Sequence, residues 1–247
     1  MCTFIINWRP DKEWPAIIAA NRDELITRPW KTPGRHWPDR PEIIAGFDEE
    51  AGGSWLGINK YGLVAGILNR TNSLGPMQGK RSRGELVLEA LDHADAFEAA
   101  KAIEDINENA YRGFNMLIVD NQDAFWIRNN GESQITSQPL PIGISMLAAH
   151  ELNDPTSPRI DHYLDKLQSI KTPNPGTEDW QEWKTVLADR SCYIKDDPRT
   201  AMNISPDHGF GTVSSSLIAL PKSTDLNPVW LFCGGAPDEN EFLPIYF

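Results

Sequence analysis

Cys2 and the run Asn21-Arg22-Asp23 are the residues of this 247-residue chain whose types and spacing best suit catalysis. Apolar runs over 3–8 and 16–20 predict two strands, and the polar connection 9–15 carries two prolines, so this segment predicts a β-hairpin. Cross-strand partners in a hairpin have a constant index sum, which places residue 2 opposite residues 21–22. We therefore expect the Cys2 thiol to lie beside one of those three polar residues.

An N-terminal nucleophile would result if Met1 is removed, which a residue as small as Cys at position 2 normally permits. The pKa of a chain-terminal amine is about 8, so part of it is neutral at physiological pH and can accept the thiol proton. Arg22 would lower the pKa of the thiol, because a nearby cation favours the thiolate, and Asp23 would hold or orient the ammonium. The alternatives are an ordinary buried cysteine and a structural Arg22–Asp23 ion pair.

Two asparagines at the ends of predicted strands are further candidates. Asn69 follows the strand expected over 63–68 and precedes a polar loop, where site residues are often presented. Its side-chain amide would donate to a developing oxyanion, or would stabilise its own turn. Asn115 begins the strand expected over 115–119 and, like Asn21, is a candidate for substrate binding.

The segment 27–41 is predicted to be a loop, because it contains four prolines. Its aromatic residues Trp30, His36 and Trp37 would form a substrate lid or pocket wall, or would simply pin the loop to the body. His36 is also the residue considered as a haem or metal ligand, although no second ligand accompanies it.

Arg83 ends a short basic run over 80–83. It would clamp an anionic group of a substrate, such as a carboxylate or phosphate. The alternative is a helix start, because Ser82 stands three residues before Glu85 and the two would form a capping box.

An ordered set of motifs spans nearly the whole chain: Met1-Cys2-Thr3, Ala19-Ala20-Asn21-Arg22-Asp23-Glu24, Arg28-Pro29, Gly52-Gly53-Ser54-Trp55-Leu56-Gly57-Ile58, Leu68-Asn69, Ser82-Arg83-Gly84-Glu85-Leu86, Gly113-Phe114-Asn115, Gly143-Ile144-Ser145 and Gly209-Phe210-Gly211-Thr212. In these motifs the chain resembles the NRDE family, also called the transport-and-Golgi-organisation family. The chain differs from the family pattern at two positions: Met146 stands where Asn is expected, and Val213 stands where Arg is expected.

The resemblance implies an N-terminal-nucleophile hydrolase fold, which is an α+β, four-layer αββα sandwich with mainly antiparallel sheets. A single domain over 1–247 is expected. Relatives on this fold include choloylglycine hydrolases and penicillin acylases. Some family members are linked to haem movement and to lipid or Golgi homeostasis instead of a defined hydrolysis.

Composition narrows the classes of partner. The formal net charge is −12 at pH 7, which argues against nucleic-acid binding and against attraction to an anionic membrane surface. The chain shows no signal-peptide pattern and no apolar run near eighteen residues, so a cytoplasmic protein without stable membrane insertion is expected. Its three cysteines lack metal-ligand or redox spacing, so no metal or resident cofactor is expected, and the oligomeric state stays open.

The regular elements follow from periodicity. Helices are expected over 84–91, 94–107, 158–167 and 177–188, and strands also over 124–128, 142–147, 212–220 and 229–233. The leading functional hypothesis is an amidohydrolase-like enzyme acting on a small amide or acyl substrate. Its rival is a non-catalytic carrier of haem or a lipid-like ligand on the same fold.

Overall fold

The computed structural model describes residues 2–195 and 197–247, so the predicted removal of Met1 concerns a residue outside the described ones. The chain forms two compact units. The first unit comprises Met1–Arg28 and Pro141–Tyr246, and the second comprises Pro29–Leu140 with Phe247. Whether they act as one domain stays a prediction.

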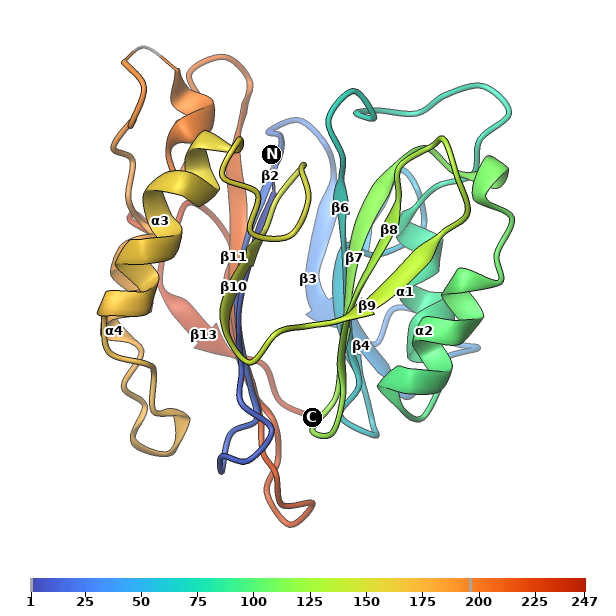
Figure 1. Cartoon of the computed structure of the whole chain (residues 1–247), viewed down its shortest axis with the longest axis horizontal. Coiled ribbons are helices and arrows are strands. Elements are labelled where there is room, and N and C mark those ends of the chain that lie inside the picture. Colours follow the sequence, from blue (N-terminus) through green and yellow to red (C-terminus); the bar gives the residue numbers. More distant parts are fainter. Residues whose placement is uncertain (1, 196) are drawn as a thin grey trace. The chain divides into compact units, whose positions relative to one another are not determined.

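The first unit is built on an antiparallel sheet with strand order β10-β1-β2-β11-β12-β13. Figure 1 labels β2, β10, β11 and β13 of this sheet. Its strands are β1 (Thr3–Trp8), β2 (Ala16–Leu25), β10 (Gly143–Leu147), β11 (Phe210–Leu220), β12 (Val229–Cys233) and β13 (Phe242–Pro244). The hairpin β1–β2 pairs Thr3 with Asn21 and Trp8 with Ala16, which confirms the predicted index sum. The long strand β2 lies between β1 and β11 and is therefore hydrogen-bonded along both edges.

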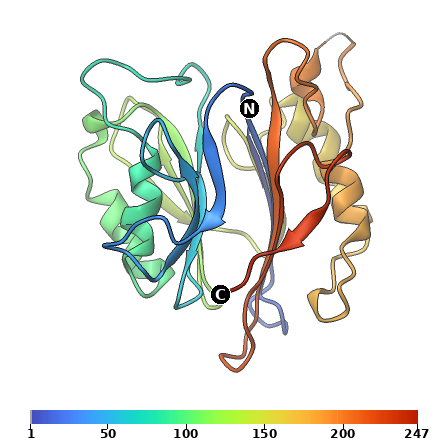
Figure 2. The ribbon, with the colours of Figure 1, turned by 180° about the vertical axis from the view of Figure 1, so that it is seen from behind.

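Helices α3 (Pro158–Ser169) and α4 (Gln181–Leu187) cover one face of this sheet, as both ribbon views show (Figures 1 and 2). Short 3₁₀ turns, η2 (Pro175–Thr177) and η3 (Pro198–Thr200), lie in the connections. The core between helices and sheet contains Trp180, Trp183 and Tyr163 packed with apolar residues of β1, β2 and β11. Because strand side chains alternate between faces, the odd-numbered residues of β2, such as Ile17 and Ala19, face this core.

The second unit is built on an antiparallel sheet whose strands follow chain order from β3 to β9. These strands are β3 (Trp30–Gly34), β4 (Ile43–Asp48), β5 (Leu56–Asn59), β6 (Val64–Asn69), β7 (Phe114–Val119), β8 (Ala124–Asn129) and β9 (Thr136–Pro139). The prediction of a loop over the whole of 27–41 is wrong, because β3 lies within it. Pro33 is tolerated there because β3 is an edge strand whose pairing with β4 is irregular between Lys31 and Gly34.

Helices α1 (Gly84–Leu91) and α2 (Ala96–Glu104) pack on this second sheet, and a 3₁₀ turn, η1 (Glu108–Ala110), precedes β7. Their apolar faces join residues such as Ile43, Phe114 and Met116 in one core. The predicted capping box is formed only in part: the Ser82 hydroxyl accepts a hydrogen bond from the N–H of Gly84 over 3.3 Å, but Arg83 is the N-cap of α1. The Glu85 carboxylate instead accepts a 2.5 Å hydrogen bond from the Tyr111 hydroxyl.

The Gly52-Gly53 pair lets the chain approach the start of α1 closely. A Cβ added at Gly53 would lie 2.4 Å from the carbonyl carbon of Gly84, and the backbone N–H of Ser54 donates to the oxygen of Gly84 over 3.0 Å. Gly52 adopts a φ of +72° with open space around it. The two glycines are therefore required for different reasons.

We expect Gly53→Ala to lower the free energy of unfolding by about 2 kcal/mol, because backbone atoms on both sides must shift. Gly52→Ala is the matched control and should lose only about 1 kcal/mol, from left-handed backbone strain. Urea unfolding of the two variants measures both values. A Gly53→Ala variant at least as stable as Gly52→Ala would contradict the close approach.

Each sheet is antiparallel and carries helices on one face, so the predicted α+β class is confirmed. Within the described residues, no helix is both long and apolar enough to cross a membrane.

Candidate active site

The Cys2 sulfur meets the backbone of Asp23 at the open end of the β1–β2 hairpin. The N–H of Asp23 donates to the sulfur over 3.4 Å, and the sulfur lies 3.5 Å from the carbonyl oxygen of the same residue. This contact follows from the strand register, because Thr3 pairs with Asn21 and residue 2 extends the hairpin by one position. The predicted neighbourhood of the thiol is therefore observed.

The pKa of the Cys2 thiol is raised above its ordinary value, first by burial and then by the negative charge of Asp23. The positive charge of the chain terminus, the hydrogen bond from the Asp23 backbone and the Arg22 guanidinium oppose this rise, in that order, but they do not overcome it. Arg22 therefore lowers the pKa of the thiol, as predicted, although the net shift is upward. The physical reason is that desolvation disfavours a thiolate more strongly than one cation stabilises it here.

The Asp23 carboxylate is fully buried and held by two side chains from distant segments. Arg159, in the first turn of α3, donates from Nη1 to Oδ2 over 3.0 Å, and the two side chains are 2% and 0% exposed. The hydroxyl of Thr212 donates to Oδ1 over 2.7 Å. Both carboxylate oxygens therefore accept hydrogen bonds, as expected of the ionised form.

Arg159 also contacts the segment that begins at Cys2. Its Nη1 donates to the hydroxyl of Thr3 over 2.7 Å, and its Nη2 donates to the carbonyl of Arg199 in η3 over 3.1 Å. The guanidinium thus joins β1, β2, α3 and η3 within the first unit.

Arg22 projects from the face of β2 opposite to that of Asp23, because neighbouring strand residues alternate. Its guanidinium is 5% exposed and lies 4.0 Å from the carboxylate of Glu24, which occupies the same face. The carboxylate of Asp23 pairs with Arg159. The alternative of a structural Arg22–Asp23 pair is therefore not the arrangement that the structure describes.

Asn21 is buried and its side chain makes three hydrogen bonds within the fold. Its Nδ2 donates to the carbonyls of Leu187 and Met202 over 3.0 and 2.9 Å, and its Oδ1 accepts from the Ser215 hydroxyl over 2.6 Å. These bonds connect β2 to α4, to the segment before β11 and to β11 itself. They give Asn21 a structural role, and its predicted contact with substrate stays a prediction.

The other predicted polar residues lie in the second unit. Asn69 is the last residue of β6, half-buried and paired with Phe114 of β7. The Oδ1 of Asn115 accepts hydrogen bonds from Arg70 over 2.7 Å and from the indole of Trp126 over 3.2 Å. The roles of Asn69 in oxyanion stabilisation and of Asn115 in substrate binding stay predictions.

Arg83 holds a loop of the second unit. Its Nη1 donates to the carbonyls of Ser73 and Gly113 over 2.7 and 3.0 Å. These acceptors are neutral backbone groups that connect the start of α1 to the segments after β6 and before β7. Its use as an anion clamp stays a prediction.

The predicted aromatic residues are packed around β3 and β4. The indole of Trp37 donates to the carbonyl of Gly52 over 3.0 Å, and His36 stacks on Phe47 with ring centroids 5.4 Å apart. Trp30 makes an edge contact with Trp55, with centroids 5.9 Å apart. These contacts agree with the alternative in which the aromatics pin the segment. A lid, a pocket wall or a haem ligand at His36 stays a prediction.

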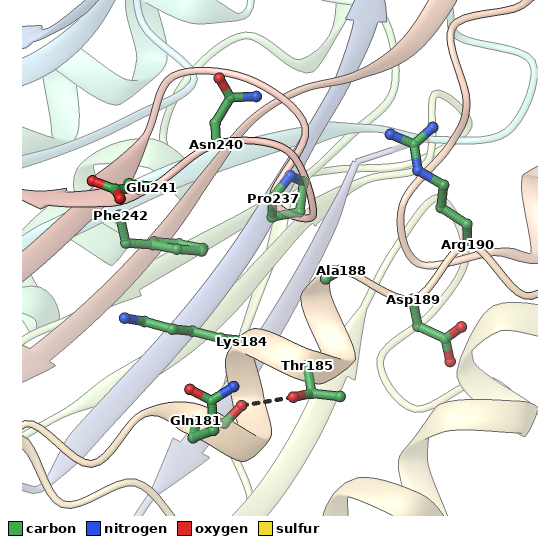
Figure 3. A pocket seen from close by; sticks show the side chains of 10 residues that line it. All are labelled: Gln181, Lys184, Thr185, Ala188, Asp189, Arg190, Pro237, Asn240, Glu241 and Phe242. Atoms are coloured by element: carbon green, nitrogen blue, oxygen red, sulfur yellow. Dashed lines mark hydrogen bonds between the residues drawn. The ribbon is translucent and has the colours of Figure 1, made fainter.

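A surface cavity of about 800 Å³ in the first unit lies between α4 and the residues around β13 (Figure 3). Lys184 and Phe242 line it, and the ammonium of Lys184 is 5.3 Å from the Phe242 ring centroid. Arg190 also lines it and donates to the carboxylate of Asp238. None of the predicted site residues that the structure describes lines this cavity.

Sequence reasoning missed Arg159, Thr212 and Thr3 as neighbours of the site. A signal for Arg159 was available, because it stands one turn before Tyr163 on a helix whose buried stripe includes Ile160 and Tyr163. A charged side chain in such a stripe requires a buried partner of opposite charge. The identity of that partner is not local, since Asp23 is 136 positions away.

The two departures from the family motifs occupy defined places. Met146 is fully buried in the helix-side core, and its backbone N–H donates to the side chain of Asn153 over 2.7 Å. Val213 lies at the irregularity in β11 where the pairing with β2 shifts between Thr212 and Ser214. This bulge lies opposite Asp23 and Arg22, beside the site.

Solved structures show what fold the chain has. An N-acylethanolamine-hydrolyzing acid amidase ortholog from Caenorhabditis elegans is similar with a TM-score of 0.62, at 14% identity over 91% of this chain and 94% of that one. Penicillin V acylase from Agrobacterium tumefaciens follows with 0.54, at 15% identity over 94% and 82%. Conjugated bile acid hydrolase from Clostridium perfringens gives 0.53, at 12% identity over 100% and 97%. These likenesses confirm the predicted N-terminal-nucleophile hydrolase fold.

Relatives in sequence are found among animal proteins. The Transport and Golgi organization 2 homolog of Mus musculus and its Homo sapiens counterpart are each 35% identical over 130 residues, which are 49% of this chain. The matched region covers 45% of the length of each of these relatives, which is about half. The family model described as Transport and Golgi organisation 2 matches residues 1–228. The chain therefore belongs to the Transport and Golgi organisation 2 family, as its motifs predicted.

Proposed function

We propose that this protein hydrolyses the amide bond of a small N-acyl substrate, with Cys2 as the nucleophile. The observation that carries the proposal is the contact between the Cys2 sulfur and the N–H of Asp23, at the end of the central hairpin. The fold adds support, because the structurally similar proteins are an acid amidase, an acylase and a bile acid hydrolase. Each of these names describes the cleavage of an acyl or amide compound.

Burial and the Asp23 charge raise the pKa of the Cys2 thiol and so disfavour the thiolate. The proposed attack therefore includes a base that takes the thiol proton. Removal of Met1 would supply that base as the α-amine of Cys2, whose pKa of about 8 leaves a neutral fraction at physiological pH. Nucleophile and base would then belong to one residue.

The steps follow from this pairing. The α-amine takes the thiol proton while the sulfur attacks the carbonyl carbon, which forms a tetrahedral oxyanion. The intermediate collapses, the C–N bond breaks, and the ammonium returns its proton to the leaving amine. Water then attacks the acyl thioester with the amine again as base, which releases the acid and restores the thiol.

The surrounding residues take roles that follow from their charges. Arg22 favours the thiolate as it develops, and the Asp23 N–H donates to the sulfur and holds it in place. The predicted contact between Asp23 and the ammonium, and the oxyanion contact of Asn69, belong to this proposal as roles to be tested.

The experiment is a turnover assay with three probe classes taken from the structural relatives: an N-acylethanolamine, penicillin V and a conjugated bile acid. Release of the amine or acid is followed by mass spectrometry, and intact mass establishes whether Met1 is absent. For a probe that is turned over, we expect Cys2→Ala to lower kcat/KM at least about 1,000-fold. Cys192→Ser, which changes an exposed thiol, is the matched control and should leave turnover unchanged.

Two outcomes would overturn the proposal. Turnover that survives Cys2→Ala would show that the sulfur is not the nucleophile. Full activity in protein that retains Met1 would remove the α-amine from the mechanism.

A further inference from the structure

We infer that Arg159 is the positioning residue of this site: its guanidinium fixes the two strand ends between which the Cys2 sulfur lies. The inference deepens the proposed function and rests on it for its catalytic meaning. It concerns a residue of α3 that lies 157 positions after Cys2, by the difference of their numbers.

A single nitrogen of Arg159 contacts both strands of the hairpin. Nη1 of Arg159 donates both to the Thr3 hydroxyl, over 2.7 Å, and to the Asp23 carboxylate, over 3.0 Å. Thr3 follows the nucleophile in the chain, and Asp23 provides the N–H that meets the sulfur. One donor group therefore holds the residues next to the sulfur on both strands.

A second nitrogen of the guanidinium makes a further contact that holds it in place. Nη2 donates to the carbonyl of Arg199 in η3, and Arg159 as a whole is 2% exposed. Because a guanidinium is planar, two bonds from different nitrogens define its orientation. Motion of the Arg159 side chain relative to β1 and β2 is therefore restricted.

The Asp23 carboxylate is fixed on its other oxygen by a directed hydrogen bond. The Thr212 hydroxyl accepts from the backbone N–H of Ile204 over 2.8 Å, so its own proton points to Asp23 Oδ1. With Arg159 on Oδ2, the carboxylate cannot rotate without breaking a buried bond. The backbone of Asp23, and with it the donor to the sulfur, is held in place by this arrangement.

The charge of Arg159 also affects the ionisation of the Cys2 thiol. The charge of Asp23 contributes to the raised pKa of Cys2, and the adjacent positive charge of Arg159 offsets part of that field at 3.0 Å from the carboxylate. A variant without the guanidinium would therefore leave the sulfur both less firmly held and more strongly opposed to ionisation.

The test measures alkylation of Cys2 by iodoacetamide across pH in a Cys192→Ser background, with the modified residue identified by mass spectrometry. We expect Arg159→Met to lower the alkylation rate at pH 7.5 about tenfold and to move the midpoint of the pH profile upward. Arg159→Lys keeps the charge but not the two-nitrogen fork, so the midpoint should return toward the native value. Arg190→Met, which removes an arginine paired with Asp238 in the same unit, is the matched control and should leave the profile unchanged.

Thr3→Val provides a second variant, because it removes one bond to Arg159 while keeping the shape of a β-branched strand residue. It should slow alkylation by about threefold with little change in the folded fraction, since only one of the hydrogen bonds of Arg159 is lost. Circular dichroism at the assay temperature confirms that each variant is folded.

Folded Arg159→Met and Thr3→Val variants with the native rate and midpoint would overturn the inference. An equal change in the Arg190→Met control would also overturn it, because the effect would then be a general loss of stability. Alkylation needs no turnover, so the two proposals fail separately. A protein that hydrolyses none of the probes but shows the Arg159 dependence would contradict the proposed function alone.

Discussion

Replacing Asp23 with alanine is expected to lower the free energy of unfolding by about 3–5 kcal/mol, because it leaves the guanidinium of Arg159 buried without its carboxylate. The two side chains are 0% and 2% exposed and lie 3.0 Å apart, so water cannot readily replace the lost partner. The loss should be visible in urea unfolding at pH 7 as a lower midpoint with an unchanged slope.

A double variant separates the ion pair from the packing around it. Asp23→Leu combined with Arg159→Met removes both charges and fills much of the same volume, so we expect it to recover most of the stability that Asp23→Ala loses. Asp179→Ala serves as control, because it breaks an exposed pair with Lys171 and should leave the unfolding midpoint nearly unchanged. A loss below about 1 kcal/mol for Asp23→Ala would mean that solvent reaches the pair.

The sequence predicted those features of the site that depend on residues close together in the chain. The β1–β2 connection is short, so the index sum of the hairpin places Cys2 opposite Arg22 and one residue from Asp23 without any tertiary information. Helix α1 begins and ends where the apolar period predicted, at Gly84 and Leu91. Such elements are determined by neighbours within a few residues, and tertiary packing did not override them.

The part that the sequence did not predict depends on long-range pairing. Arg159 reaches Asp23 across 136 positions, and Thr212 reaches it across 189. No periodicity relates residues so far apart, because only the assembled sheet and α3 bring them together. The proximity of β11 to β2, which places Thr212 opposite Asp23, is likewise a property of the strand order.

Two features of the site have local physical causes. The direction in which Arg22 acts on the thiol pKa is as predicted, but burial and the Asp23 charge together outweigh it. The side chains of Arg22 and Asp23 were expected to act side by side, although strand alternation already directs consecutive residues to opposite faces. The period of two therefore predicts that Asp23 faces the helix side of the sheet and that Arg22 faces the other side.

Asn21→Ala is expected to lower the free energy of unfolding by about 3 kcal/mol, because it leaves two buried carbonyls and a hydroxyl without their present partner. These groups belong to Leu187, Met202 and Ser215, so the single side chain connects β2 with α4 and β11. Thermal or urea unfolding of the variant measures the loss, and the alkylation rate of Cys2 in the folded protein measures any effect on the site.

Asn7→Ala is the matched control for this prediction. Asn7 is also a buried asparagine of the same sheet, but the hydrogen bond that its Nδ2 donates goes to one hydroxyl, that of Thr172, over 3.2 Å. Its replacement should therefore cost about 1 kcal/mol, and the difference between the two variants reports the additional bonds of Asn21. If Asn21→Ala instead kept native stability and raised KM for a probe substrate, the structural role would be wrong and the side chain would belong to the substrate site, as the sequence had predicted.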